Sequence, residues 1–231
     1  MKKIAILTGG GDAPGLNAAI KAVVKKSYIN GWQVVGVNDG WAGLLKGKVF
    51  ALPVEDVENI EREGGTILGT SRTNPYKEEK GPELVKANLK KFEIDALVAI
   101  GGEDTLGVAH KLTKEGLSIV AVPKTIDNDL SETDVCIGFD TAFFIAGDAV
   151  ERLHATAKSH SRTLVVEIMG RHAGWLALYA GLAGGAHMIL IPEFPFSIDE
   201  VARIVNERRE KGKLYTTIAA AEGAKPGEQV T

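Results

Sequence analysis

Residues 3–19 read KIAILTGGGDAPGLNAA, an unbroken apolar run that leads through three glycines into a helix-like pattern. An apolar run without alternation indicates a strand buried on both faces, as strands of parallel sheets are. Further runs of this kind occur at residues 34–37, 96–100, 118–122, 163–168, 187–191 and 215–221. Helical patterns separate them, at residues 14–30, 82–92, 104–115, 139–160, 172–184 and 198–211. This alternation predicts an α/β fold with doubly wound, mostly parallel sheets.

The composition is that of an ordinary globular protein and argues against several classes of partner. Of 231 residues, 45% are apolar and 25% are charged, and the formal net charge is −3. Because Lys and Arg are scattered, we expect neither a nucleic-acid surface nor a membrane-binding patch. The single cysteine, Cys136, excludes an internal disulfide. Since the first residues also lack the apolar stretch of an export signal, a cytoplasmic location is expected.

Two glycine-rich turns follow predicted strands, which is where ligands bind in such folds. In the first, residues 9–19, the glycines allow close approach of an anion, Pro14 suits the first helical turn and Asp12 suits its cap. This turn fits neither the dinucleotide nor the Walker pattern, so a phosphate site and a simple tight turn remain equally open. In the second, IGGEDTLG (100–107), Glu103 and Asp104 place two negative charges where an anion normally binds.

A long glycine-rich and polar stretch, residues 62–82, is predicted to be a surface loop, and loops of this length are often functional. It contains SRTN (71–74), in which Arg72 offers the forked donor that suits phosphate. A single arginine in a loop is more commonly just solvated, and the sequence leaves that interpretation open.

Two further motifs follow later predicted strands. VPKTIDNDLSETD (122–134) contains Lys124, Thr125, Asp127 and Asp129, and such carboxylates can take a proton from an attacking hydroxyl or help to hold Mg²⁺. EIMGRHAGW (167–175) places Arg171 at the same edge, where it suits a phosphoryl group. From these residues alone, the chain is a Mg²⁺-dependent phosphotransferase or a binder of sugar phosphates.

Taken together, the motifs resemble those of a known family. TGGGDAPGLNAAI, GGEDTLGVA, PKTIDNDL, GFDTA and MGRHAGW, in this order and at these separations, look like the phosphofructokinases over essentially the whole chain. The resemblance implies two Rossmann-like domains, with residues 1–138 binding the phosphoryl donor and residues 139–231 binding the sugar phosphate. It also implies that the second domain is incomplete, because family members continue past the position of Thr231.

The resemblance further implies Mg²⁺-dependent phosphorylation of fructose 6-phosphate at its 1-hydroxyl, in glycolysis. Asp127 is then the base for this hydroxyl, and Glu103 binds Mg²⁺. The residues expected to contact the donor are Gly11, Arg72, Gly102, Asp104 and Lys124. Those expected to contact the sugar phosphate are Thr125, Asp127, Asp129, Arg162, Met169, Gly170, Arg171 and Glu222. The expected catalytic residues are Asp127, Lys124, Asp104, Thr125 and Arg171.

The identity of the donor depends mainly on Asp104. In family members that use ATP the matching position is glycine, which leaves room for the α-phosphate of the nucleotide. An aspartate fills that room and repels the phosphate charge, whereas Lys124 can steady a shorter donor. The pair is the pattern of the pyrophosphate-dependent branch, in which the reaction runs in both directions.

Two alternatives stay open. One is an ATP-dependent 6-phosphofructokinase, and the other is a non-catalytic phosphosugar-binding module. The implied role of Arg162, which reaches the sugar phosphate of a neighbouring subunit, predicts a homo-oligomer, either a dimer or a tetramer.

Overall fold

The computed structural model describes residues 1–227 and divides the chain into two compact units. The first consists of Met1–Thr125 with Glu132–Gly138, and the second of Ile126–Ser131 with the chain from Phe139 onward. This division differs from a cut after residue 138 in one segment, residues 126–131. Ile126 packs into the core of the second unit, which accounts for the difference. Residues 228–231, the end of the second predicted domain, lie outside the described residues.

The first unit is built on a six-stranded sheet with the strand order β3-β2-β1-β4-β5-β6. All neighbouring pairs are parallel except β2 and β3. Its strands are β1 (Lys3–Gly9), β2 (Gln33–Val37), β3 (Val49–Ala51), β4 (Ala96–Gly101), β5 (Ile119–Thr125) and β6 (Ile137–Gly138). Its helices are α1 (Leu16–Ile29), α2 (Gly40–Lys46), α3 (Gly81–Lys91) and α4 (Glu103–Lys114), with short 3₁₀ turns at Val54–Val57, Ile60–Arg62 and Pro75–Lys77.

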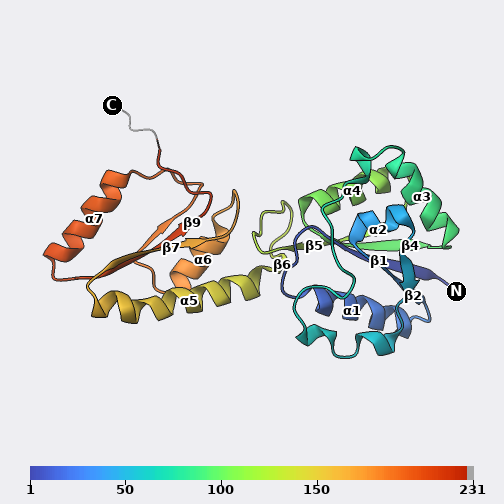
Figure 1. Ribbon diagram of the computed structural model, residues 1–231, viewed down its shortest axis with the longest axis horizontal. Helices are drawn as coiled ribbons and strands as arrows, with labels where there is room; N and C mark the ends of the chain where they lie inside the picture. Colours follow the sequence, from blue (N-terminus) through green and yellow to red (C-terminus); the bar gives the residue numbers. More distant parts are fainter. Residues whose placement is uncertain (228–231) are drawn as a thin grey trace. The chain divides into compact units, whose positions relative to one another are not determined.

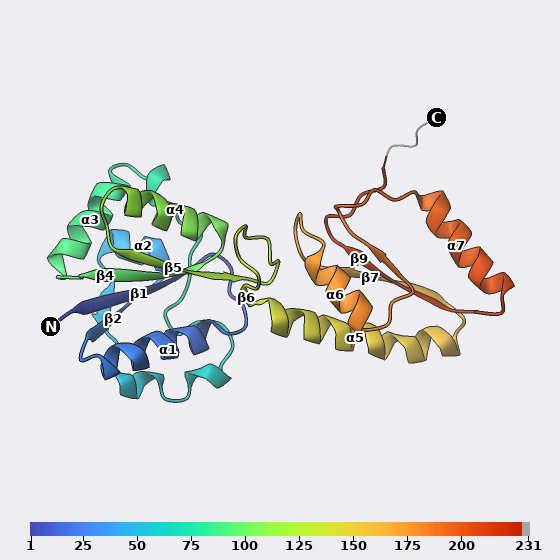
Figure 2. The same ribbon diagram turned by 180° about the vertical axis from the view of Figure 1, so that it is seen from behind.

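Both faces of this sheet are covered, as the apolar runs predict. Figures 1 and 2 show α1 on one face and α2, α3 and α4 on the other. Successive residues of β1 point to opposite sides, so Ala5 and Leu7 join the core under α2–α4 while Ile6 joins the core under α1. The prediction of an α/β fold with mostly parallel sheets is therefore confirmed.

The second unit contains a parallel sheet with the order β7-β9-β8. Its strands are β7 (Thr163–Ile168), β8 (Met188–Leu190) and β9 (Thr216–Ala221), and its helices are α5 (Phe139–Ser159), α6 (Trp175–Ala183) and α7 (Ile198–Glu210). Helices α5 and α6 pack on this sheet and form its core, which includes Val150, Ala177 and Ala219. Helix α7 has no buried residue.

Two local predictions need correction. Helix α1 begins at Leu16 and not at residue 14, because Gly15 adopts a left-handed conformation (φ 88°) and serves as the N-cap. Asp12 and Pro14 thus precede the helix, and Asp12 is not its cap. The stretch 62–82 is not entirely a surface loop, because Leu68 is buried in the core beneath α1.

The turns at the ends of β1 and β4 require glycine because Thr105 packs against both of them. A Cβ on Gly101 would lie 2.5 Å from the Thr105 Cβ, and one on Gly9 would lie 2.4 Å from the Thr105 Oγ1. Thr105 is itself buried in the first turn of α4. The close approach of this helix to the strand ends therefore depends on the absence of side chains there.

We expect Gly101→Ala to lower the free energy of unfolding by roughly 1–3 kcal/mol, because the new methyl group overpacks the contact with Thr105. The matched control is Gly107→Ala in the same helix α4, where a new Cβ meets no described atom within 4 Å outside the helix backbone. This control should be neutral or stabilise by up to about 1 kcal/mol. Urea unfolding of both variants measures the difference, and equal effects would contradict the role of Thr105.

Candidate active site

The glycine turns lie at the point where the strand order of the six-stranded sheet reverses. Strands β2 and β4 lie on opposite sides of β1, and Gly9 at the end of β1 pairs with Gly101 at the end of β4. In open α/β sheets, ligands bind outside the carboxyl ends of the strands at such a switch point. The structure therefore brings the turns 9–11 and 101–102 together at the position expected for a bound ligand.

The side chain of Lys124 holds the first of these turns, residues 9–11, in place. Its side chain is only 3% exposed, and its Nζ donates a hydrogen bond to the carbonyl of Gly11. Gly102 is adjacent, since a Cβ on it would lie 3.6 Å from the carbonyl oxygen of Lys124. Three of the predicted donor residues, Gly11, Gly102 and Lys124, thus share one edge of the sheet.

The SRTN segment is held against the same turn. The N–H of Gly10 donates to the carbonyl of Ser71 (2.9 Å), and the hydroxyl of Thr70 donates to the carbonyl of Gly10 (2.6 Å). Arg72 follows directly, and its side chain is exposed. Within residues 1–227, its guanidinium forms no hydrogen bond or ion pair and is available to a ligand anion.

Glu103 and Asp104 form the first turn of α4, immediately after Gly102. Both side chains are exposed. Negative charges are favourable at a helix N-terminus, which accounts for their stability in this position.

The predicted site residues of the PKTIDND segment (123–129) differ in how far they are exposed to solvent. Thr125 ends β5 and is half-buried, whereas Asp127 is buried, with 7% of its surface exposed. Asp129 is exposed, and Asn128 between the two carboxylates adopts a left-handed conformation (φ 53°). Asp127 and Asp129 belong to the second unit and Lys124 to the first, so the segment contributes residues to both.

At the carboxyl end of β7, Glu222 holds the turn that carries Arg171. Its Oε1 accepts hydrogen bonds from the N–H groups of Arg171 (2.6 Å) and Gly170 (3.0 Å). Arg171 adopts a left-handed conformation (φ 53°), which costs free energy for a residue with a side chain. The structure thus brings Gly170, Arg171 and Glu222 together, with Met169 exposed directly before them.

These hydrogen bonds alter the acidity of Glu222. The N–H groups of Arg171 and Gly170, followed by the charges of Arg171 and His172, lower the pKa of the Glu222 carboxyl below its ordinary value of 4.5. The charged form of Glu222 therefore stabilises the folded turn.

The stability contribution of Glu222 should depend on pH. Because the folded-state pKa is lowered, the contribution is complete above the unfolded-state pKa and is lost as the pH falls through the lowered value. We expect Glu222→Gln to unfold more easily than the unsubstituted chain at neutral pH, and the difference to shrink once the pH falls below 4.5. Urea unfolding over a pH series measures this, with Glu210→Gln, exposed at the end of α7, as the control. A difference that does not change with pH would contradict the prediction.

Arg162 is not brought to this turn. It is exposed, lies directly before β7, and its carbonyl accepts a hydrogen bond from the N–H of Thr216 (3.2 Å). Met169 to Arg171 follow the opposite end of β7, and a strand of this length spans about 20 Å. Within one chain, Arg162 is thus separated from the other predicted sugar-phosphate residues.

The carboxylate of Glu103, next to the second glycine turn, fits Mg²⁺ bound together with a phosphate ligand. Among residues 1–227, no three His, Cys, Asp or Glu side chains gather into a metal site of their own. Mg²⁺ commonly needs only one or two protein carboxylates, because waters and substrate phosphates complete its octahedral shell. Glu103, which is exposed and follows Gly102 directly, meets that requirement.

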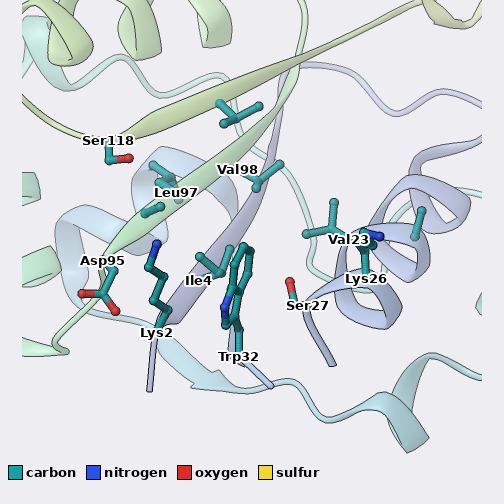
Figure 3. A pocket seen from close by; sticks show the side chains of 13 residues that line it. Lys2, Ile4, Val23, Lys26, Ser27, Trp32, Asp95, Leu97, Val98 and Ser118 are labelled. Atoms are coloured by element: carbon teal, nitrogen blue, oxygen red, sulfur yellow. The ribbon is translucent and has the colours of Figure 1, made fainter. Parts of the chain in front are cut away.

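An apolar pocket of about 630 Å³ lies at the opposite end of the strands of the first unit's sheet, away from the glycine turns. Its walls include Ile4, Trp32 and Leu97, which Figure 3 labels. Val120, near the start of β5, also lines it. These residues lie near the amino ends of the strands, opposite the glycine turns. None of the predicted donor residues lines this pocket.

Sequence reasoning missed three polar side chains that support the site. Thr8 and Asn17 are buried and hydrogen-bond to the stretch 63–69, and Glu193 accepts a hydrogen bond from the N–H of Gly174 (2.7 Å), next to the turn of Arg171. A threonine at the end of the apolar run KIAIL and an asparagine in the first turn of a helix were the only signals. Neither reveals its partner.

The helices of the described part of the chain, residues 1–227, include none that is both long enough and apolar enough to cross a bilayer.

Comparison with known proteins agrees with this arrangement. A family model described as Phosphofructokinase matches residues 3–231. The chain is 58% identical over 226 residues to a pyrophosphate–fructose 6-phosphate 1-phosphotransferase of Amycolatopsis methanolica, covering 97% of this chain and 66% of that protein. It is 49% identical over 225 residues to the ATP-dependent 6-phosphofructokinase 3 of Streptomyces coelicolor, with the same coverage of 97% and 66%.

A solved structure of phosphofructokinase from Saccharomyces cerevisiae has a similar fold. It aligns with a TM-score of 0.88 at 40% identity, covering 98% of this chain and 34% of the yeast chain. The chain thus spans 66% of the length of the curated relatives named above. The match across residues 3–231, together with these identities, places the chain in the phosphofructokinase family.

Proposed function

We propose that the protein transfers a phosphoryl group from pyrophosphate to the 1-hydroxyl of fructose 6-phosphate, reversibly and in glycolysis. The observation that carries this proposal is the pair of glycine turns at residues 9–11 and 101–102, here called the donor turns, where Asp104 lies in the first turn of α4 and the buried Lys124 holds Gly11. The relative from Amycolatopsis methanolica, whose name states this reaction, supports the same donor.

The choice of donor follows from charge at this turn. The exposed carboxylate of Asp104 repels the phosphate charge of a donor whose phosphate chain extends past it, as that of a nucleoside triphosphate does. A donor with two phosphates ends before that point. Arg72 and the backbone N–H groups of the glycine turn offer it charge-assisted hydrogen bonds.

Most of the residues that bind the acceptor in this proposal belong to the second unit. Arg171 and Gly170, on the turn held by Glu222, contact the 6-phosphate, and Met169 and Glu222 contact the sugar. Asp127 accepts the proton of the 1-hydroxyl while that oxygen forms a bond to the terminal phosphorus. The bond from this phosphorus to the bridging oxygen breaks, and orthophosphate leaves with the bond electrons. Thr125 and Asp129 orient the hydroxyl.

Mg²⁺ fits at Glu103, where it would neutralise negative charge on the donor phosphates. Lys124 keeps the glycine turn in place from beneath. Because a bound Mg²⁺ would neutralise the charge of the carboxylate, Glu103 can be part of a phosphate site directly after the second glycine turn.

A second candidate is an ATP-dependent 6-phosphofructokinase. It is favoured by relatives with that name at 49% and 51% identity. The two candidates share the acceptor residues and differ in the donor.

Arg162 is separated from the turn at Met169–Arg171, which supports a homo-oligomer in which Arg162 contacts the sugar phosphate bound to a neighbouring copy. Sedimentation at working concentration tests this part of the proposal. A monomer that is fully active would contradict it.

The deciding experiment measures formation of fructose 1,6-bisphosphate from fructose 6-phosphate and Mg²⁺ with pyrophosphate or ATP, using the natural protein. Turnover with pyrophosphate and little with ATP is the expected result. Turnover with ATP alone would identify the second candidate, and turnover with neither donor would overturn both.

A further inference from the structure

We propose that the buried side chains of Thr8 and Asn17 position the segment 63–72, here called the Arg72 loop, and thereby set the affinity for the phosphoryl donor. In this proposal neither residue contacts the donor. Each acts indirectly, by positioning Arg72. The inference rests on the proposed function for the assignment of the donor. The contacts themselves belong to the first unit.

Thr8 forms two of these contacts. Its side chain is 0% exposed, its hydroxyl donates to the carbonyl of Gly69 (2.7 Å), and its Oγ1 lies 2.9 Å from the Oγ1 of Thr66. Because Thr8 has one hydroxyl hydrogen, Thr66 must donate to Thr8. The Thr66 Oγ1 in turn accepts the N–H of Leu68 (3.2 Å). The hydroxyl of Thr8 thus ties the end of β1 to the middle of the Arg72 loop.

Asn17 holds the beginning of the same loop with both ends of its amide. It is 2% exposed, its Nδ2 donates to the carbonyl of Glu63 (3.1 Å), and its Oδ1 accepts the N–H of Ile67 (2.9 Å). A buried amide that satisfies one carbonyl and one N–H has no equally sized substitute, since aspartate lacks the donor and leucine lacks both groups. Asn17 therefore fixes the conformation of the loop as well as its distance from α1.

The positioned loop ends at the donor turn. After Gly69, Thr70 and Ser71 each form a hydrogen bond to Gly10, and Arg72 is next in sequence. The loop has no regular structure between Arg62 and Pro75, so its order depends on these side chains, on the buried Leu68 and on Asp39. The N–H of Asp39 donates to the carbonyl of Leu68 (2.9 Å), and the carbonyl of Asp39 accepts from the hydroxyl of Ser71 (2.7 Å). An arginine on a loop that is already ordered loses less conformational entropy when it binds an anion. Donor affinity should therefore depend on Thr8 and Asn17.

The first test replaces Thr8 by valine, which keeps the shape of the side chain and removes the hydroxyl. The KM for pyrophosphate should rise roughly 5- to 10-fold, whereas kcat and the KM for fructose 6-phosphate should change less than about 2-fold. Thr8→Ser, which restores the hydroxyl, should return the KM for pyrophosphate toward its original value. Asn17→Asp should raise this KM in the same way, because it loses the bond to Glu63.

The matched control is Ser27→Ala. Ser27 is buried like Asn17 and belongs to the same helix, but lies in its last turn. This variant should leave the KM for pyrophosphate unchanged even if it lowers stability. Equal rises in the KM for both substrates in Thr8→Val, or an unchanged KM for pyrophosphate, would overturn the proposal.

A double-mutant cycle tests whether Thr8 acts through Arg72. In an Arg72→Ala background, Thr8→Val should add little to the loss of donor affinity, whereas additive effects would contradict the proposed route. Hydrogen exchange of residues 63–72, which needs no activity, should be faster in Thr8→Val and unchanged in Ser27→Ala. If the unsubstituted protein neither uses nor binds pyrophosphate, the proposed function and the link to donor affinity both fail. The positioning of the loop is still judged by the exchange rates.

Discussion

Replacement of Asp127 by asparagine is expected to lower kcat by roughly 10²- to 10⁴-fold, the usual contribution of a general base. The affinity for fructose 6-phosphate should change by less than about threefold, because the amide keeps the size of the side chain and one acceptor oxygen. Initial rates with pyrophosphate give kcat, and calorimetric titration with fructose 6-phosphate gives the affinity. The buried position of Asp127 makes the preservation of its shape important.

The control for this variant is Glu132→Gln, which removes one charge from an exposed position in the segment that follows β5. Its kcat should remain close to that of the unsubstituted protein. If Asp127→Asn retains turnover within about tenfold, Asp127 is not the base. If the unsubstituted protein binds fructose 6-phosphate but turns over no donor, the chain is a phosphosugar-binding module.

The second large effect is expected for Asp104→Gly, which should raise kcat/KM for ATP on the order of 100-fold. Two unit charges about 4 Å apart repel by roughly 1–4 kcal/mol between the limits of water and a protein surface, and 1.4 kcal/mol corresponds to a factor of ten. Removal of the exposed carboxylate at the start of α4 removes both this repulsion and the side-chain volume. Initial rates with ATP and with pyrophosphate measure the change.

Asp104→Asn separates the two contributions, because it removes the charge and keeps the volume. If charge dominates, this variant should use ATP nearly as well as Asp104→Gly. If volume dominates, it should resemble the unsubstituted protein. An unchanged preference for pyrophosphate in both variants would show that Asp104 does not select the donor.

The regular elements were predictable where local signals are strong. Continuous apolar runs identified β1, β4, β5, β7 and β9. Strands β1 and β4 are largely buried, as such a run indicates, whereas Val120 of β5 and Val165 of β7 are exposed. Glycine turns and charged residues at the ends of these runs identified the residues of the candidate site. The short helix α2 escaped prediction, since Gly40 and Gly43 weaken a local helical pattern that the burial of Trp41 and Leu44 stabilises.

The partners of the site residues depend on contacts between distant parts of the chain. Lys124 bonds to Gly11, 113 residues earlier, and Glu222 bonds to Arg171, 51 residues earlier. Thr8 and Asn17 likewise hold a loop whose nearest contacted residues lie 46 or more positions away. The amino-acid sequence specifies which groups can donate, accept or carry charge, because these are properties of single side chains and their neighbours. Which donor meets which acceptor depends on strand order and loop path, and these arise only when the whole chain packs.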